Sequence, residues 1–241
     1  MKRFFVDSIE NPIVLRGENH KHLSVVLRAR AGDEVALCCG DGYDYVCRVE
    51  RVEKDLTRLT LSEKRVSQGE PLVAVTLYAS VLKGDKNDFV VQKATELGAT
   101  EIVPVFTRYV QAHDRACKTE RLQKIAREAA QQCGRGRVPA VRAAISFDTL
   151  LREVGDFDTV VFPYEKAVAP SLRSFLRAQS ENVPARAAVI VGSEGGFADE
   201  EVAALQACGV TPVTLGKRIL RAETASVSVL SALMYEWGQW E

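Results

Sequence analysis

The stretch Ala187-Ala188-Val189-Ile190-Val191-Gly192-Ser193-Glu194-Gly195-Gly196-Phe197 decides the fold class, because a short apolar run passes directly into a glycine-rich loop. A second stretch, Leu215-Gly216-Lys217-Arg218-Ile219-Leu220-Arg221-Ala222-Glu223-Thr224-Ala225, follows further along the chain. Each predicts a strand that ends in a loop and continues into a helix. Ligands of open α/β sheets bind beyond the carboxyl ends of the strands, and glycine lets the backbone approach them closely. One such loop could be an ordinary turn, but two from neighbouring units favour a binding site.

The composition is that of an ordinary globular protein. The chain has 241 residues, of which 46% are hydrophobic and 27% charged, enough for one large domain or two smaller ones. The net charge is zero, so the whole-chain balance does not indicate a nucleic-acid partner. No apolar run is long enough to span a bilayer, and Met1–Asp7 lacks the apolar core of a signal peptide. We therefore expect a cytoplasmic protein with no membrane partner.

Cysteine and histidine do not predict a metal site. The six cysteines contain no C-x-x-C pair, and His20, His22 and His113 form no zinc-ligand cluster with them. Buried, reduced thiols explain this usage best.

The first part of the chain is predicted to be rich in strands. Glu34–Cys39 and Tyr43–Val52 flank a glycine-bearing hairpin turn, Thr57–Lys64 continues the series, and His20–Val26 is helical. Short strands with tight turns favour a small β-barrel over residues 1–68. The polar stretch Arg65–Pro71 is expected to be the linker.

From residue 72 to 241 strands and helices alternate, which predicts a second, α/β domain with a mostly parallel sheet covered on both faces. The expected strands are Leu72–Leu82, Ile102–Phe106, Thr159–Phe162, Ala187–Val191 and Val213–Leu215. The expected helices are Asp88–Leu97, Thr119–Cys133, Phe147–Val154, Pro170–Ala178, Asp199–Ala207 and Thr224–Trp237.

Basic residues concentrate between Arg108 and Arg142, with nine Lys/Arg against three acids, a surplus of six. Such a strip can supply phosphate contacts, whereas the alternative is a solvated helix face with i,i+4 ion pairs. Arg135 and Arg137 fit the second explanation less well, because they lie on a glycine-flexed loop.

The glycine loops do not carry a nucleotide-phosphate fingerprint. Gly192–Gly196 is not G-x-G-x-x-G, lacks the Lys-Ser/Thr of a phosphate-binding loop, and is followed by acids at positions 199–201 that repel phosphate. The next strand ends in the basic Leu215-Gly216-Lys217 rather than in an acid. Backbone groups and apolar walls (Leu215, Ile219, Leu220) suit adenosine with a sulfonium tail better than a pyrophosphate.

Together the two loop stretches resemble the SPOUT methyltransferases, and among them the small-subunit ribosomal RNA uridine-N3 methyltransferases. The resemblance runs the length of the chain. Its other motifs are His22-Leu23 with Val26-Leu27-Arg28 and Gly32-Asp33, Gln92–Gly98, and Glu128-Ala129 with Gln132–Arg135 and Val138-Pro139. Two departures are visible. Ser193 stands for the commoner Pro, and Ala198 replaces a usual Ser, which removes a helix cap typically worth ~1 kcal/mol.

This resemblance implies an N-terminal PUA-like barrel that holds RNA and a C-terminal SPOUT domain with a trefoil knot. It also implies a homodimer that methylates N3 of a uridine in 16S rRNA, within the small ribosomal subunit. S-adenosylmethionine would be bound by Phe162, Val191, Gly192, Gly196, Leu215, Gly216, Ile219, Leu220, Thr224 and Ala225. Candidate RNA contacts are Arg3, Arg28, Lys93, Arg127 and Arg135.

Methylation at N3 requires the uracil N–H to lose its proton as the methyl group arrives. Arg221 is the candidate for stabilising the uracilate oxygens or anchoring the target phosphate, and its alternative role is a salt bridge to Glu223 or Glu194. Glu223 or Glu194 could be the base, or could instead cap backbone N–H groups. Two other functions stay open: methylation of a ribose 2′-hydroxyl, and a non-catalytic RNA-binding or assembly role.

Overall fold

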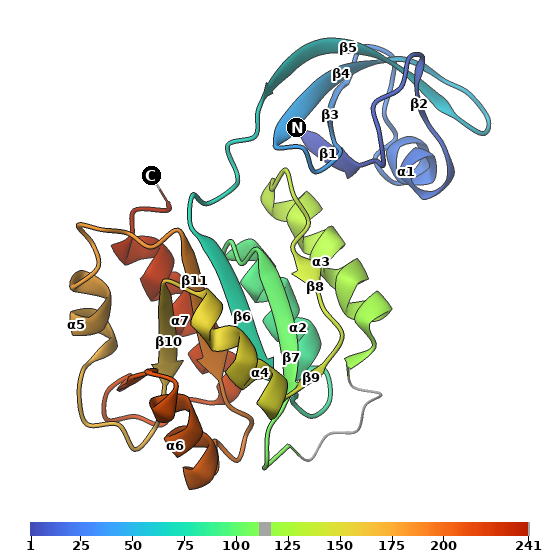
Figure 1. Cartoon of the computed structure of the whole chain (residues 1–241). Coiled ribbons are helices and arrows are strands. Elements are labelled where there is room, and N and C mark those ends of the chain that lie inside the picture. The colour runs from blue at the N-terminus through green and yellow to red at the C-terminus, as the bar shows by residue number, and fades with distance from the viewer. Residues whose placement is uncertain (111–116, 241) are drawn as a thin grey trace. The chain divides into compact units, whose positions relative to one another are not determined.

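The computed structural model describes residues 1–110 and 117–240, which form two compact units (Figure 1). The first unit comprises Met1–Glu70 and Ala130–Val138, and the second comprises Pro71–Ala129 and the chain from Pro139 onward. Helix α3 (Thr119–Cys133) contributes residues to both. No sequence signal indicated that residues 130–138 would join the first unit.

The first unit is built on a curled five-stranded sheet. Its strand order is β1 (Lys2–Phe5), β3 (Glu34–Cys38), β4 (Tyr43–Val52), β5 (Thr57–Val66) and β2 (Ile13–Leu15). Only β1 and β3 pair in parallel. Helix α1 (Gly17–Lys21) and a π-helical turn (His22–Val26) connect β2 to β3. Alternating side chains fill a core that includes Phe4, Leu37 and Val49.

Three strands of this unit are predicted correctly, and two are missed. β1 and β2 have four and three residues, too few to show alternation, and both lie at the edges of the sheet. β5 continues to Val66, so the polar stretch after it is shorter than the predicted linker.

The second unit contains a seven-stranded sheet in which every described pairing is parallel, as predicted. The strand order is β12 (Pro212–Val213), β10 (Thr159–Pro163), β11 (Arg186–Val191), β6 (Ala74–Ser80), β7 (Glu101–Phe106) and β8 (Ala140–Val141), with β9 (Ile145–Ser146) also on β7. The helices are α2 (Lys86–Glu96), α3, α4 (Phe147–Glu153) with a 3-10 turn at Val154–Asp156, α5 (Leu172–Arg177), α6 (Asp199–Ala207) and α7 (Ala222–Glu236).

Helices cover both faces of this sheet. α4 packs with α6 and on β7, whereas α2 and α5 pack on α7, which lies on β11 (Figure 1). Between the sheet and the α4–α6 layer lies a core that contains Tyr78, Phe162 and Ile190. Strands buried on both faces explain why their sequences are nearly continuous apolar runs.

Two boundary predictions are wrong for local reasons. α5 does not begin at Pro170 but after Ser171, whose hydroxyl oxygen accepts a hydrogen bond from the Ser174 N–H and caps the helix. α7 begins two residues before the predicted Thr224.

The thiols are all free, as expected, but Cys133 and Cys208 are exposed rather than buried.

The chain turns in opposite directions after two neighbouring strands. From β6 it leads through α2 to β7 on one side, and from the adjacent β11 it leads through α6 to β12 on the other. This arrangement defines a topological switch point, and a crevice for ligands opens at the carboxyl ends of such strands.

Candidate functional site

A cavity of about 690 Å³ lies at the carboxyl ends of β10, β11 and β12 in the second unit. Three loops line it: residues 163–168 after β10, residues 191–197 after β11, and residues 214–220 after β12. Ala222 and Ala225 at the start of α7 complete the wall. The volume lies within the range that small-molecule sites occupy, roughly 300–1,000 Å³.

Glycine gives these loops their shape. Gly196 and Gly216 have φ values of +72° and +101°, in the left-handed region that side chains disfavour. A Cβ on Gly196 would lie 2.8 Å from a carboxylate oxygen of Glu165, in the loop after β10. A Cβ on Gly192 would lie 2.8 Å from the ring of Phe197. The loops therefore pack together only because these positions have no side chain.

An aromatic cluster supports the loop after β11. Phe197 packs edge-on against Phe162 at a centroid distance of 5.1 Å, and Phe162 stacks on Tyr164 at 6.0 Å. Phe162 is fully buried. Because the rings fix Phe197 in the core, they also fix the glycines that precede it in the chain.

The structure places most of the predicted donor-site residues around this cavity. Val191, Gly192, Gly196, Leu215, Gly216, Ile219, Leu220 and Ala225 line it. Phe162 does not line the cavity but packs against Phe197, which does. Thr224 is exposed and does not line the cavity. The loop after β10 was missed, because it contains no glycine. Its only signal was its place after a predicted strand.

Glu194 connects two loops. Its Oε1 accepts a hydrogen bond from Lys86 Nζ at 2.8 Å and another from the Lys83 N–H at 3.2 Å. Burial by itself raises the pKa of Glu194, but the bonds from Lys86 and from the backbone outweigh it, so the pKa lies below the usual 4.5. A carboxylate with a lowered pKa is a weak proton acceptor. Glu194 is therefore an anchor between loops rather than a suitable base.

Arg221 and Glu223 lie where the cavity meets α7. Arg221 is the exposed N-cap residue of that helix, between the lining residues Leu220 and Ala222. In the described part of the chain, Glu194 pairs with Lys86, and no ion pair is found between Arg221 and Glu194 or Glu223. Glu223 has one buried carboxylate oxygen, Oε2, with no hydrogen-bond partner among those residues.

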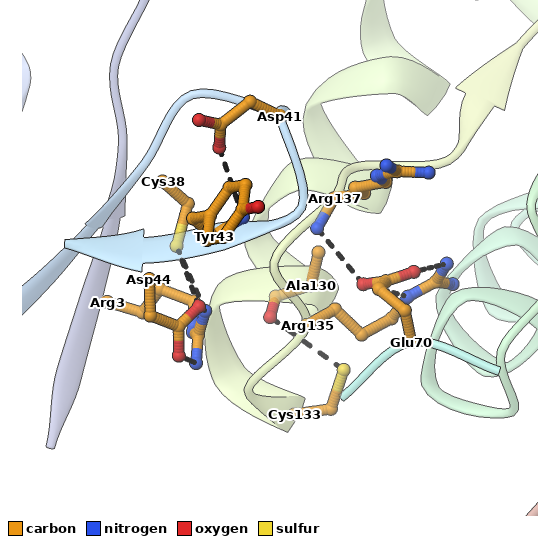
Figure 2. Close-up of polar contacts among 10 residues, drawn as sticks. All are labelled: Arg3, Cys38, Asp41, Tyr43, Asp44, Glu70, Ala130, Cys133, Arg135 and Arg137. Atoms are coloured by element: carbon orange, nitrogen blue, oxygen red, sulfur yellow. Dashed lines mark hydrogen bonds and ion pairs between the residues drawn. The ribbon is translucent and has the colours of Figure 1, made fainter. Parts of the chain in front are cut away.

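Two predicted RNA contacts are engaged inside the first unit (Figure 2). The Arg135 side chain is only 3% exposed and pairs with Glu70, with Nη2 and Oε2 at 2.7 Å. Arg3 forms a two-pronged ion pair with Asp44, with Nη2 and Oδ2 at 2.8 Å, and its side chain is 10% exposed. These arginines hold the unit together, which argues against direct contact with phosphate.

The other predicted RNA contacts are more accessible. Arg28 is exposed at φ +52°, two residues after the exposed Val26. Arg127 is exposed on α3, whereas Lys93 pairs with Glu96 at 2.8 Å. Of the basic strip, Arg115 and the acid Asp114 lie outside the described residues.

Residues 1–110 and 117–240 contain no group of three or more His, Cys, Asp or Glu that could hold a metal ion. His113 lies outside these ranges. Over the same residues, every helix is too short or too polar to span a bilayer.

Comparison with known proteins places this geometry among RNA-modifying enzymes. A family model described as an RNA methyltransferase domain matches residues 68–234. The ribosomal RNA small subunit methyltransferase E of Bacillus subtilis is 33% identical, over 98% of this chain and 97% of that protein. The protein of the same name from Mesomycoplasma hyopneumoniae is 30% identical, over 96% of this chain and 98% of its own.

Solved structures agree over nearly the whole chain. A ribosomal RNA small subunit methyltransferase E from Neisseria gonorrhoeae, bound to S-adenosylmethionine, has a TM-score of 0.87 at 29% identity, covering 98% of both chains. A putative methyltransferase from Legionella pneumophila, also with S-adenosylmethionine bound, has a TM-score of 0.84 at 29% identity, covering 97% of this chain and 96% of its own.

Proposed function

The chain belongs to the ribosomal RNA small subunit methyltransferase E family, and we propose that it methylates N3 of a specific uridine in 16S rRNA, using S-adenosylmethionine. It is an RNA methyltransferase by family. The cavity at the ends of β10, β11 and β12 carries the more specific proposal, because it offers the right chemistry for this methyl donor.

The residues present fit S-adenosylmethionine. Leu215, Ile219 and Leu220 provide apolar walls for the adenine and the carbon chain. Gly196 and Gly216 have no Cβ, so a ligand can approach the loop backbone closely, while their own N–H groups donate to the Ser193 carbonyl and the Thr214 hydroxyl and fix the loops. The carboxylate of Glu165, which also lines the cavity, can offset the positive charge of the donor. When bound, the donor supplies an electrophilic methyl group on a positively charged sulfur.

The chain itself must orient the uracil and accommodate the charge that develops on it. N3 loses its proton as the methyl group arrives, so negative charge spreads to the uracil oxygens. Arg221 is proposed to stabilise these oxygens or to anchor the target phosphate, since its guanidinium is exposed beside the cavity. Glu223 is proposed as the base, because its partnerless Oε2 has a free site for a proton.

The proposal extends to assembly and substrate. We expect the curled sheet of residues 1–68 to act as a PUA-like RNA-binding barrel, and residues 72–241 to form a SPOUT domain with a trefoil knot. We also expect a homodimer, because Ile219 and Val168 at the cavity are 84% and 92% exposed, which is unusual for apolar side chains. The substrate would be 16S rRNA within the small ribosomal subunit, in the cytoplasm. Arg28 and Arg127 remain the proposed RNA contacts.

One experiment tests the activity directly. Small ribosomal subunits from a strain lacking this protein are incubated with the purified protein and labelled S-adenosylmethionine, and the modified base is mapped by mass spectrometry of digested RNA. N3-methyluridine at one position is the expected product. A 2′-O-methyl product would contradict the N3 assignment. RNA binding without methyl transfer would indicate the non-catalytic role.

A further inference from the structure

We propose that a second cavity, of about 510 Å³, receives the target nucleotide, with Tyr109 stacking on the uracil and Lys83 and Lys86 contacting the phosphate backbone. Its described lining is Lys83, Lys86, Tyr109, Glu194 and Gly195. This inference rests on the proposed methyl transfer, and adds to it the residues that position the acceptor.

The position of the cavity in the fold is the first argument. Lys83 and Lys86 follow β6, and Glu194 and Gly195 follow the adjacent β11. These are the two strands from which the chain leads in opposite directions. The cavity therefore occupies the topological switch point, where open α/β sheets bind their ligands. The donor cavity lies on the β10 and β12 side of the same edge.

Adjacency to the donor cavity is the second argument. Glu194 and Gly195 line both cavities, so only the loop after β11 separates them. Methyl transfer requires the acceptor atom and the methyl group to meet in line, which demands neighbouring sites for base and donor. No other cavity described at this edge shares two residues with the donor site and also carries lysines.

The chemistry of the lining suits a nucleotide. Tyr109 is 48% exposed, so its ring is available to a base, and single-stranded RNA is commonly held by stacking on aromatic rings. A Cβ on Gly195 would lie 2.8 Å from the Tyr109 Cβ, so the aromatic residue packs directly on the shared loop. Lys86 is held by Glu194 at 2.8 Å, which fixes an ammonium group at the edge of the cavity.

A third cavity shows which side of Tyr109 the RNA approaches. It has a volume of about 760 Å³ and is also lined by Tyr109, but it carries Asp148, Glu200 and Glu201 against a single Arg108. Three carboxylates repel a phosphate backbone. The lysine side of Tyr109 is therefore the side that accepts the nucleotide.

The test compares Tyr109→Ala and Tyr109→Phe with Phe89→Ala in the full-length protein. The substrate is the small ribosomal subunit from a strain that lacks this protein. Phe89 is a matched control, since it is 44% exposed in the same unit but lines neither the donor cavity nor the second cavity. Tyr109→Ala should lower kcat/KM for the subunit by about 5-fold to 150-fold, which corresponds to ~1–3 kcal/mol of base stacking. Phe89→Ala should retain near-wild-type activity, and Tyr109→Phe, which keeps the aromatic ring, should recover most of the activity that Tyr109→Ala loses.

Calorimetry with S-adenosylmethionine distinguishes a lost nucleotide contact from a loss of folding or of donor binding. Tyr109→Ala should bind the donor as the wild type does, which also shows that the variant is folded. Lys83→Ala should reduce the slope of log affinity for the subunit against log salt by about 0.7, the value for one single-strand phosphate contact. If the wild type is active and Tyr109→Ala has the same kcat/KM for the subunit, the proposed nucleotide site is wrong while the proposed function stands. A wild type that binds the subunit but transfers no methyl group would overturn the proposed function itself.

Discussion

Replacing Gly196 with alanine should abolish tight binding of the methyl donor while leaving the protein folded. Two effects combine at this position. The left-handed backbone at φ +72° costs a non-glycine residue ~1–2 kcal/mol. The new Cβ would also lie 2.8 Å from the Glu165 carboxylate, which lines the same cavity. Glu165 or the loop must move, and either movement changes the wall of the donor site.

Gly209→Ala separates the backbone effect from the effect on the cavity. Gly209 has φ +83° and follows α6 outside the cavity lining, and a Cβ added to it would meet nothing within 4 Å. Both variants should unfold ~1–2 kcal/mol more easily, which lowers Tm by about 2–8 °C for a protein of this size. Only Gly196→Ala should lose affinity for S-adenosylmethionine, by at least about tenfold, which corresponds to ~1.4 kcal/mol.

The assays are thermal unfolding and isothermal titration calorimetry of the wild type and both variants. Equal donor affinity in Gly196→Ala and the wild type would refute the placement of the donor in this cavity. A matching loss of affinity in Gly209→Ala would show instead that general loosening of the unit, rather than the loop wall, controls binding.

Three further substitutions test contacts within the first unit and within the second unit. Arg135→Gln should destabilise the first unit by about 3–5 kcal/mol, measured by urea denaturation, because it leaves the carboxylate of Glu70 without its charged partner in a mostly buried site; retained stability with weakened RNA binding would instead restore Arg135 as an RNA contact. Burial by itself raises the pKa of Asp44, but the hydrogen bonds and the charge of Arg3 outweigh burial, so the pKa lies below its usual 3.8. The ion pair between Arg3 and Asp44 therefore stabilises the folded state fully above the unfolded pKa near 3.8, and this stabilisation is lost as the pH falls through the folded pKa. Asp44→Asn should remove that part of the acid dependence in a pH series of unfolding curves, and an unchanged series would contradict the assignment. Ala198→Ser should stabilise the second unit by about 1 kcal/mol, because the N-cap residue Ala198 has no side-chain acceptor for the N–H groups of the first turn of α6, and only the Glu201 carboxylate, which accepts from the Ala198 N–H, caps this end. An unchanged Tm would show that the buried site has no room for the hydroxyl.

Much of the proposed donor site could be predicted from local sequence, and the proposed acceptor site could not. The glycine loops after β11 and β12 were visible because glycine marks positions that need a left-handed backbone or close approach. Tyr109 lies in the loop after β7 and Lys86 is the first residue of α2, so no short sequence motif contains both. Only the pairing of β6 between β11 and β7 brings them to one edge.

Charge in the sequence did not show which arginines the fold pairs with carboxylates. Arg135 lies in a basic, glycine-flexed stretch, which predicted an RNA contact, but the fold buries it against Glu70, a residue 65 positions earlier in the chain. Arg3 is likewise paired with Asp44 across the first sheet. A sequence shows how many charges a segment carries, but the solvent exposure of each charge depends on partners far away in the chain.

The sequence by itself determined the alternation of strands and helices in the second unit, the parallel sheet, and the two glycine loops at the ends of its strands. These features depend on periodicity and on backbone conformation, which are local properties of the chain. The tertiary structure alone decided which loops share a cavity, that residues 130–138 join the first unit, and that Glu194 is paired with Lys86 rather than poised as a base. Those outcomes depend on strand order and on burial, and both arise from contacts between residues that are distant in sequence.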